Sequence, residues 1–169
     1  MKKSIIRYSL YGSLTLSVLF VLGMAIGGSI DYSTSEVFGY ASMVISLLFV
    51  FFGIKHFRDH INDGKVTLGK AIVIGLLISL FSAIGFAIVD YIYTTSINPN
   101  FAVEYKEYTM TQLNEANLSA EDFKTKVDEL EASMDMMGSS SFMAFVMFGT
   151  VMIIGFIISL ISGLVLQRK

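Results

Sequence analysis

The chain has 169 residues, of which 54% are hydrophobic and 15% are charged, and its formal net charge is -2. A soluble domain is normally about 45–50% apolar, and here the excess is concentrated in four long runs. The sequence contains no cysteine, which excludes disulfides, thiolate metal sites, iron–sulfur clusters and cysteine nucleophiles. The composition therefore indicates a membrane protein.

The four apolar runs lie at about 5–30, 37–54, 70–93 and 142–166. A membrane-spanning helix needs about 20 apolar residues, and a helix satisfies its backbone hydrogen bonds internally in lipid. A basic start followed by an apolar run is also typical of a secretory signal, whose apolar core has about 7–15 residues. The greater length of this first run favours a span. We expect one integral membrane domain over 1–169, with an all-α four-helix transmembrane bundle.

The basic residues predict the orientation of this bundle. Nine of the twelve Lys and Arg residues fall on one side of it: Lys2, Lys3, Arg7, Lys55, Arg58, Lys65, Lys70, Arg168 and Lys169. Positively charged residues are enriched in cytoplasmic loops. The sequence therefore predicts a multi-pass protein with its N- and C-termini in the cytoplasm.

The acidic segment over 94–141 is the longest connection between two spans. Asn98 and Pro99 predict a helix start, because Asn caps free amides and Pro tolerates the first helical position. Ser119 and Asp122 resemble a capping box at the start of a second helix, with Asp in place of Glu or Gln. We expect an extracytoplasmic helical hairpin between the third and fourth spans.

The second helix of this hairpin carries an apolar stripe with spacings of three and four residues. Its members are Phe123, Val127, Leu130 and Met134. Such a stripe usually packs within its own fold or lies along a membrane surface, and this interpretation is favoured. The alternative is an interaction face for another protein or a second copy of the chain.

Histidines and aspartates recur at helical spacing after the second run, at His56, Asp59, His60 and Asp63. On a continuing helix these residues share one face, and imidazole with carboxylate is a weak candidate for a divalent metal site. Lys55 and Arg58 are interleaved, however, and there is no third histidine. A solvated helix end is favoured, so we expect neither a metal nor a cofactor.

The loop between the second and third spans is basic, with Lys55, Arg58, Lys65 and Lys70. Each such residue attracts anionic headgroups by about 1 kcal/mol near a membrane surface. Lipid-headgroup contact is therefore predicted, although topology alone also explains these residues. Asp90 lies beside tyrosines towards the far end of the third span, and we expect water to reach it there.

Small residues recur every four positions inside three of the runs. They are Gly23 and Gly27, then Gly75, Ser79 and Ala83, then Gly155, Ser159 and Gly163. Small residues let helices approach closely in lipid. Packing within the bundle explains them, and a homodimer face is the alternative.

The segment from Phe51 to Phe101 resembles a family of uncharacterised bacterial membrane proteins, domain of unknown function 4199. The resemblance rests on FFGIKHFRD at 51–59, GKVTLGKAIVIGLLISL at 64–80 and NPNF at 98–101. The resemblance implies a four-span fold in the bacterial inner membrane. It implies no activity and no catalytic residues.

The sequence carries neither a GxSxG nor an HExxH motif, so we expect no catalytic residues and no enzyme. We expect instead a protein that acts through protein or lipid interactions in the cell envelope. The expected partners are membrane lipids, another envelope protein or a second copy, and no nucleic acid. The alternative is a small oligomeric transporter or channel with a polar path along Ser13, Thr15, Ser17, Ser79, Ser82, Thr150 and Ser159.

Overall fold

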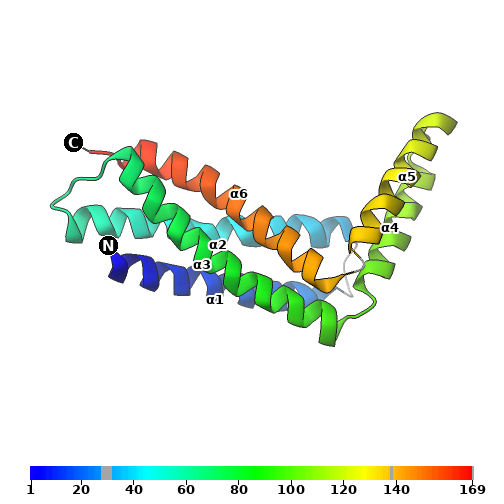
Figure 1. Cartoon of the computed structure of the whole chain (residues 1–169), viewed down its shortest axis with the longest axis horizontal. Coiled ribbons are helices and arrows are strands. Elements are labelled where there is room, and N and C mark those ends of the chain that lie inside the picture. Colours follow the sequence, from blue (N-terminus) through cyan, green and yellow to red (C-terminus); the bar gives the residue numbers. More distant parts are fainter. Residues whose placement is uncertain (28–31, 138, 169) are drawn as a thin grey trace. The chain divides into compact units, whose positions relative to one another are not determined.

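The computed structural model describes residues 1–27, 32–137 and 139–168, and its regular elements are helices (Figure 1). They are α1 (Lys2–Gly27), α2 (Tyr32–Ile61), α3 (Leu68–Ile92), the π-helical turn η1 (Tyr93–Ile97), α4 (Phe101–Glu115), α5 (Ala120–Met137) and α6 (Ser140–Leu166). In the described part of the chain, α1, α2, α3 and α6 are long and apolar enough to cross a membrane. The predicted all-α fold with four spans is confirmed.

The helices run past the predicted ends of the apolar runs. Helix α2 continues to Ile61, well beyond the predicted end at 54, and α1 already begins at Lys2. Residues 28–30, at the predicted end of the first span, lie outside the described residues. Basic side chains near a helix end can extend to the membrane surface, so a helix need not stop where its apolar run stops.

The chain divides into two compact units. The bundle unit contains Met1–Ala87 and Met147–Lys169, and the hairpin unit contains Ile88–Val146. The predicted insertion over 94–141 lies within the hairpin unit. Both chain ends lie at the same end of the bundle unit, beside the α2–α3 loop (Figure 1). We call this the terminal end of the bundle.

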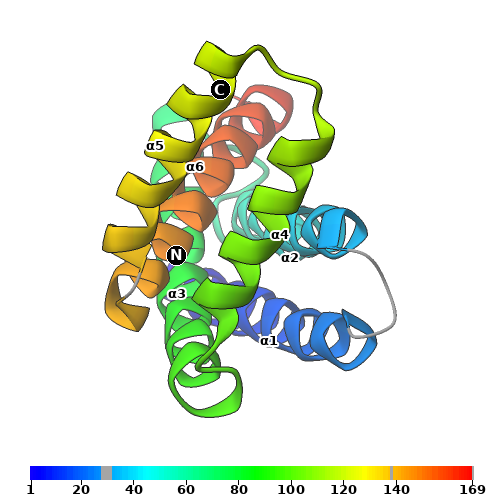
Figure 2. The same ribbon diagram turned by 90° about the vertical axis from the view of Figure 1, so that its right-hand side faces the viewer.

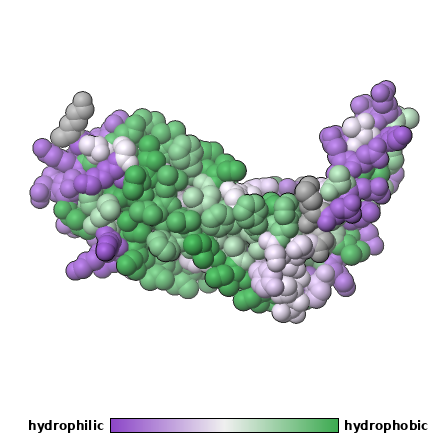
Figure 3. All heavy atoms as spheres, viewed as in Figure 1, coloured by the Kyte–Doolittle hydropathy of each residue, from purple (hydrophilic) through white to green (hydrophobic). Residues whose placement is uncertain are grey.

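The bundle unit has an inside-out distribution of side chains. Large apolar side chains are exposed on its helices, among them Leu14, Val18, Ile153, Ile161 and Val165. Serines are buried instead, including Ser46, Ser79, Ser82, Ser159 and Ser162. Figure 3 shows an apolar surface over the bundle, with hydrophilic side chains gathered at the terminal end. Soluble proteins rarely expose so large an apolar surface to water. Lipid tails are as apolar as these side chains, so the surface is suited to a membrane.

Helices α3 and α6 interlock through glycine and serine. A Cβ added at Gly75 would come within 2.6 Å of the Ser159 Cβ, and one added at Gly155 within 2.5 Å of the Ser79 Cβ. Each serine donates a hydrogen bond to the glycine carbonyl four residues earlier in its own helix, at 3.0 Å for Ser79 and 2.6 Å for Ser159. The small-residue stripes of both helices are therefore used in packing inside the bundle.

Helix α1 packs against α3 in the same manner. A Cβ at Gly12 would lie 2.8 Å from the Ser82 Oγ, and one at Gly85 would overlap the Ser13 hydroxyl. Ser82 also donates to the carbonyls of Ile78 and Ser9, at 3.0 and 3.5 Å. Aliphatic side chains fill the space between these seams, chiefly Leu47, Val50, Ile54, Ile74, Ile78 and Val151. Close backbone approach and interlocking side chains are what stabilise helix association in lipid.

In the hairpin unit, α4 and α5 run side by side in opposite directions (Figure 2). Asn117, in the turn between them, has a positive φ of 46°, as expected of Asn after a helix. The amide of Asp122 donates to the Ser119 Oγ at 3.1 Å, and the hydroxyl donates to the Asp122 Oδ2 at 2.7 Å. The predicted cap of the second helix is confirmed, and so is a helical hairpin between the third and fourth spans. Its extracytoplasmic location stays a prediction.

The predicted start of the first hairpin helix at Asn98 and Pro99 is wrong. Helix α4 begins at Phe101, and Asn100 is its N-cap residue without a side-chain hydrogen bond. Asn98 instead ends η1, and its Oδ1 accepts from the Asn100 amide at 3.2 Å. An Asn side chain that bonds two residues ahead forms a turn of its own, and this turn displaces the helix start.

Candidate functional site

The most elaborate polar arrangement in the bundle unit lies at its terminal end, where α2 turns into α3. Asp63 and Gly64 have positive φ values of 50° and 77°, and the Gly64 amide bonds back to the Arg58 carbonyl at 2.8 Å. This pattern closes a helix end by reversing the chain. The Asn62 side chain donates to the Lys65 carbonyl at 2.7 Å and holds the loop in place.

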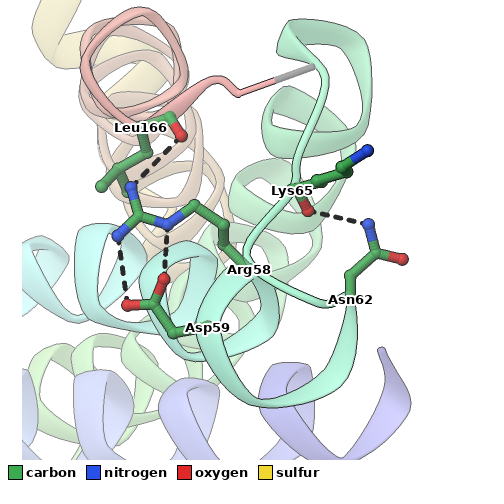
Figure 4. A network of polar contacts seen from close by, with 5 residues as sticks. All are labelled: Arg58, Asp59, Asn62, Lys65 and Leu166. Carbon is green, nitrogen blue, oxygen red and sulfur yellow. Dashed lines mark hydrogen bonds and ion pairs between the residues drawn. The ribbon is translucent and has the colours of Figure 1, made fainter.

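Arg58 joins three parts of this end (Figure 4). Its guanidinium donates from Nε to the Asp59 Oδ1 at 2.6 Å and from Nη2 to the Asp59 Oδ2 at 3.1 Å. A third bond runs from Nη1 to the Leu166 carbonyl at 3.4 Å, which is one of the free carbonyls at the end of α6. Arg58 is only 8% exposed. The two-pronged pair with a carboxylate is the strongest geometry open to arginine.

The C-terminal tail is fastened to the same loop by backbone bonds. The Val66 amide donates to the Arg168 carbonyl at 3.0 Å, and the Arg168 amide donates to the Val66 carbonyl at 2.9 Å. Thr67 then begins α3 by accepting from the Lys70 amide at 3.4 Å. The ends of α2, α3 and α6 are therefore joined by hydrogen bonds at the terminal end.

The two histidines lie where α2 meets the first turns of α1. The His56 Nδ1 and the Ser4 Oγ are 3.0 Å apart, and Tyr8 stands with its ring centroid 5.6 Å from that of His56. The His56 and His60 rings are stacked with centroids 4.9 Å apart. Ser4 is fully buried.

These placements weaken the metal hypothesis. Asp63 was predicted on the face of the histidines, but it lies beyond the end of α2 in the reversing turn. Asp59 is occupied by Arg58. Within the described ranges, no three His, Cys, Asp or Glu side chains are grouped so that they could hold a metal. His56 and His60 remain adjacent, while their two predicted carboxylate partners do not join them.

The four basic residues predicted to meet lipid headgroups differ in their surroundings. Lys55 and Lys65 are exposed, and the Lys70 ammonium lies 5.4 Å from the centroid of the Phe57 ring. Arg58 is buried, and its guanidinium is bonded to Asp59 and to the Leu166 carbonyl, so it presents no free charge to lipid. For the three lysines, headgroup contact stays a prediction.

Several of the seven residues considered for a polar path are used in helix packing. Ser79, Ser82 and Ser159 each donate a hydrogen bond to a carbonyl of their own helix, and Ser82 also donates to the Ser9 carbonyl of α1. Ser13 packs against Gly85. Ser17 lines a shallow apolar depression on the outward face of α1. The bonded hydroxyls of Ser79, Ser82 and Ser159 need no water partner, and a path along the other residues stays a prediction.

Asp90 differs from its predicted environment. The sequence predicted a carboxylate reached by water, but Asp90 is only 7% exposed, and its Oδ2 has no hydrogen-bond partner among the described residues. It stands one turn before the π-helical turn, and its carbonyl accepts from the buried Thr94 hydroxyl at 3.0 Å. The neighbouring tyrosines therefore did not predict the exposure of Asp90 correctly, because its side chain is buried.

The apolar stripe of α5 is partly covered within the hairpin unit. Leu130 is 7% exposed, and Phe123, Val127 and Met134 are half-buried. Charged side chains on the other faces form the ion pairs Lys106–Glu131 and Lys126–Glu129. A side-chain hydrogen bond with Glu129 raises the pKa of Lys126. The stripe therefore contributes to packing in this pair, and its role as an interaction face stays a prediction.

Several residues at the terminal end carry no sequence signal. Ser4 is one of many serines in apolar segments, and the Leu166 and Arg168 backbone groups belong to no motif. Only the chain reversal at Asp63 and Gly64 has a recognisable turn pattern. These residues could not be predicted from the sequence, because they meet through contacts between segments that are far apart along the chain.

The fold and the inside-out surface define a four-span helical membrane protein. A family described as Protein of unknown function (DUF4199) matches residues 7–168, and the chain belongs to this family. No curated protein and no solved structure was found that matches the chain.

Proposed function

We propose that the chain is a non-enzymatic protein of the bacterial inner membrane that acts through protein or lipid interactions. The observation that carries this proposal is the packing of the bundle interior. Ser79 and Ser159 fill the space facing Gly155 and Gly75, and their hydroxyls are bonded within their own helices. An interior built in this way favours a rigid scaffold whose two ends meet other molecules.

The proposed orientation has both termini in the cytoplasm. Support comes from the basic residues, which gather at the terminal end, and from the acidic hairpin segment at the other side of the spans. Positive charge in short loops is retained on the cytoplasmic side. The α4–α5 pair would then lie outside the cytoplasm, where another envelope protein or a second copy could contact it.

Co-purification tests the interaction proposal. The full chain is extracted from native membranes in mild detergent, and its total mass and bound proteins are measured by mass spectrometry. We expect a stoichiometric partner or a defined homo-oligomer. Val127→Lys, in the stripe, should remove it, whereas Thr125→Lys, on an exposed face of the same helix, should retain it. A monomer without any bound protein or retained lipid would contradict the proposal.

A transporter is the second candidate, and Asp90 is the observation that favours it. A buried acid within a span is a functional candidate by default, and one oxygen of this carboxylate has no hydrogen-bond partner in the described part of the chain. Proton and sodium flux would be measured in proteoliposomes under an imposed gradient. Flux that Asp90→Asn abolishes and Asp63→Asn preserves would establish transport. The same low leak in all three proteins would favour the interaction proposal.

A further inference from the structure

Basic and imidazole side chains meet at one corner of the terminal end, between α1 and α2. Ser4 and Arg7 are three residues apart on α1, so they lie on neighbouring positions of one face. The Ser4 hydroxyl binds His56 across the helix boundary at 3.0 Å. This bond joins α1 to α2 one turn before Arg7, and the His56 and His60 rings are stacked with centroids 4.9 Å apart.

The positive charge at this corner has no acidic partner of its own. The ion pairs of the described residues are Arg58–Asp59, Lys106–Glu131 and Lys126–Glu129, so Arg7 belongs to none of them. Asp59 is the acid closest in sequence to both histidines, and Arg58 binds both of its oxygens. Arg7 is exposed, so its guanidinium is free to bind an anion from outside the chain.

The imidazoles add directed donors to this charge. A Ser4 hydroxyl that donates to the His56 Nδ1 leaves the proton of a neutral ring on Nε2. His60 has no hydrogen bond in the described part of the chain, and it is exposed beside His56. An arginine fork with two adjacent imidazole donors matches the several oxygens of a phosphate group.

The corner also lies at the ends of two candidate membrane spans, and headgroup phosphates are found at the ends of such spans. The candidate spans run from Lys2 to Met24 and from Ser33 to Ile61. Arg7, His56 and His60 therefore occupy the first turns of one span and the last turns of the next. Basic pockets between membrane helices at such a level bind lipid headgroups.

We propose that Arg7, His56 and His60 form a binding site for a phosphate group, supplied by an anionic lipid or by a soluble phosphate compound. The site is distinct from the lysines of the α2–α3 loop, whose charges spread over the surface. It also does not depend on whether the bundle acts through a protein partner.

The test uses the full chain in detergent and measures retained phosphatidylglycerol against phosphatidylcholine by native mass spectrometry. Arg7→Gln should weaken phosphatidylglycerol binding about tenfold, the effect expected for loss of a charge-assisted contact. Arg168→Gln removes the same charge from the same end and should change binding by less than about twofold, because this side chain is exposed and exposed charges are screened. The His56→Gln, His60→Gln double variant should weaken binding as Arg7→Gln does.

Inorganic phosphate is then titrated against the bound lipid. Retention of lipid at high phosphate would identify a headgroup site, and displacement with the same Arg7 dependence would identify a soluble phosphate ligand. Either result supports the site. Equal losses for Arg7→Gln and Arg168→Gln would overturn it, as would equal retention of the two lipids without phosphate binding. The Arg7 variant should unfold at the wild-type temperature, because this exposed side chain forms no ion pair in the described structure.

Discussion

Glycine and serine at matched positions determine how closely α3 and α6 approach. Gly155→Ala places a methyl group against Ser79. We expect a loss of about 1–3 kcal/mol in the free energy of unfolding, because a well-packed interface resists added volume. The measurement is reversible unfolding in mixed micelles.

Gly149→Ala is the matched control in the same helix, because a Cβ there meets nothing within 4 Å. It should be neutral or stabilise by up to about 1 kcal/mol, since Ala favours a helix more than Gly does. Ser79→Gly in the Gly155→Ala background should restore part of the lost stability. Equal effects at positions 149 and 155, or no rescue, would show that the two helices do not interlock here.

Arg58 is the second residue whose contacts allow a sharp prediction. Arg58→Gln removes the pair with Asp59 and the bond to the Leu166 carbonyl. We expect a loss of about 1–3 kcal/mol, as for a buried hydrogen-bonding group left without its partner. Lys55→Gln removes an exposed charge one residue before His56 and should change stability by less than about 0.5 kcal/mol. If both variants unfold alike, Arg58 contributes only surface charge.

Among the elements, α5 begins with a cap that the sequence revealed. Ser119→Ala removes the acceptor of the Asp122 amide and should weaken the first turn by about 1 kcal/mol. Hydrogen exchange of the amides in this turn measures the effect, which should appear as faster exchange. Thr125→Ala removes a hydroxyl bonded within the helix and serves as the control. Unchanged exchange in Ser119→Ala would mean that packing on α4 alone holds the turn.

The elements also show what sequence patterns can and cannot predict. Long apolar runs predicted all four spans, because lipid leaves a continuous apolar helix as the only suitable state. Ser119 predicted a cap correctly, whereas Asn98 made its own turn and did not begin α4. Local hydrogen-bond competition decides such positions, and a residue type alone does not resolve it.

The candidate sites could be predicted only in part for a related reason. Helical spacing brought His56 and His60 together correctly. The same spacing failed for Asp63, since the chain reversal ends α2 first. Ser4 and the Leu166 carbonyl meet α2 through contacts between distant segments, and a periodic pattern contains no information about these.

At the scale of the whole molecule, serines are buried and aliphatic side chains are exposed. This distribution is expected of a protein surrounded by lipid. What remains for water is the terminal end and the hairpin unit. The first has Arg7, which forms no ion pair in the described structure, and two stacked histidines, and the second has ion pairs and a largely acidic sequence. Function in such a protein is expected at these two water-exposed parts, which the proposed orientation puts on opposite sides of the membrane.

The most direct test of this two-sided arrangement is chemical labelling of single cysteines, because the chain has no cysteine of its own. Lys65→Cys and Lys124→Cys place exposed thiols in the α2–α3 loop and on α5. With an impermeant reagent on spheroplasts, we expect labelling at position 124 only, and labelling at both positions after the membrane is permeabilised. Labelling of position 65 in sealed spheroplasts would contradict the proposed arrangement.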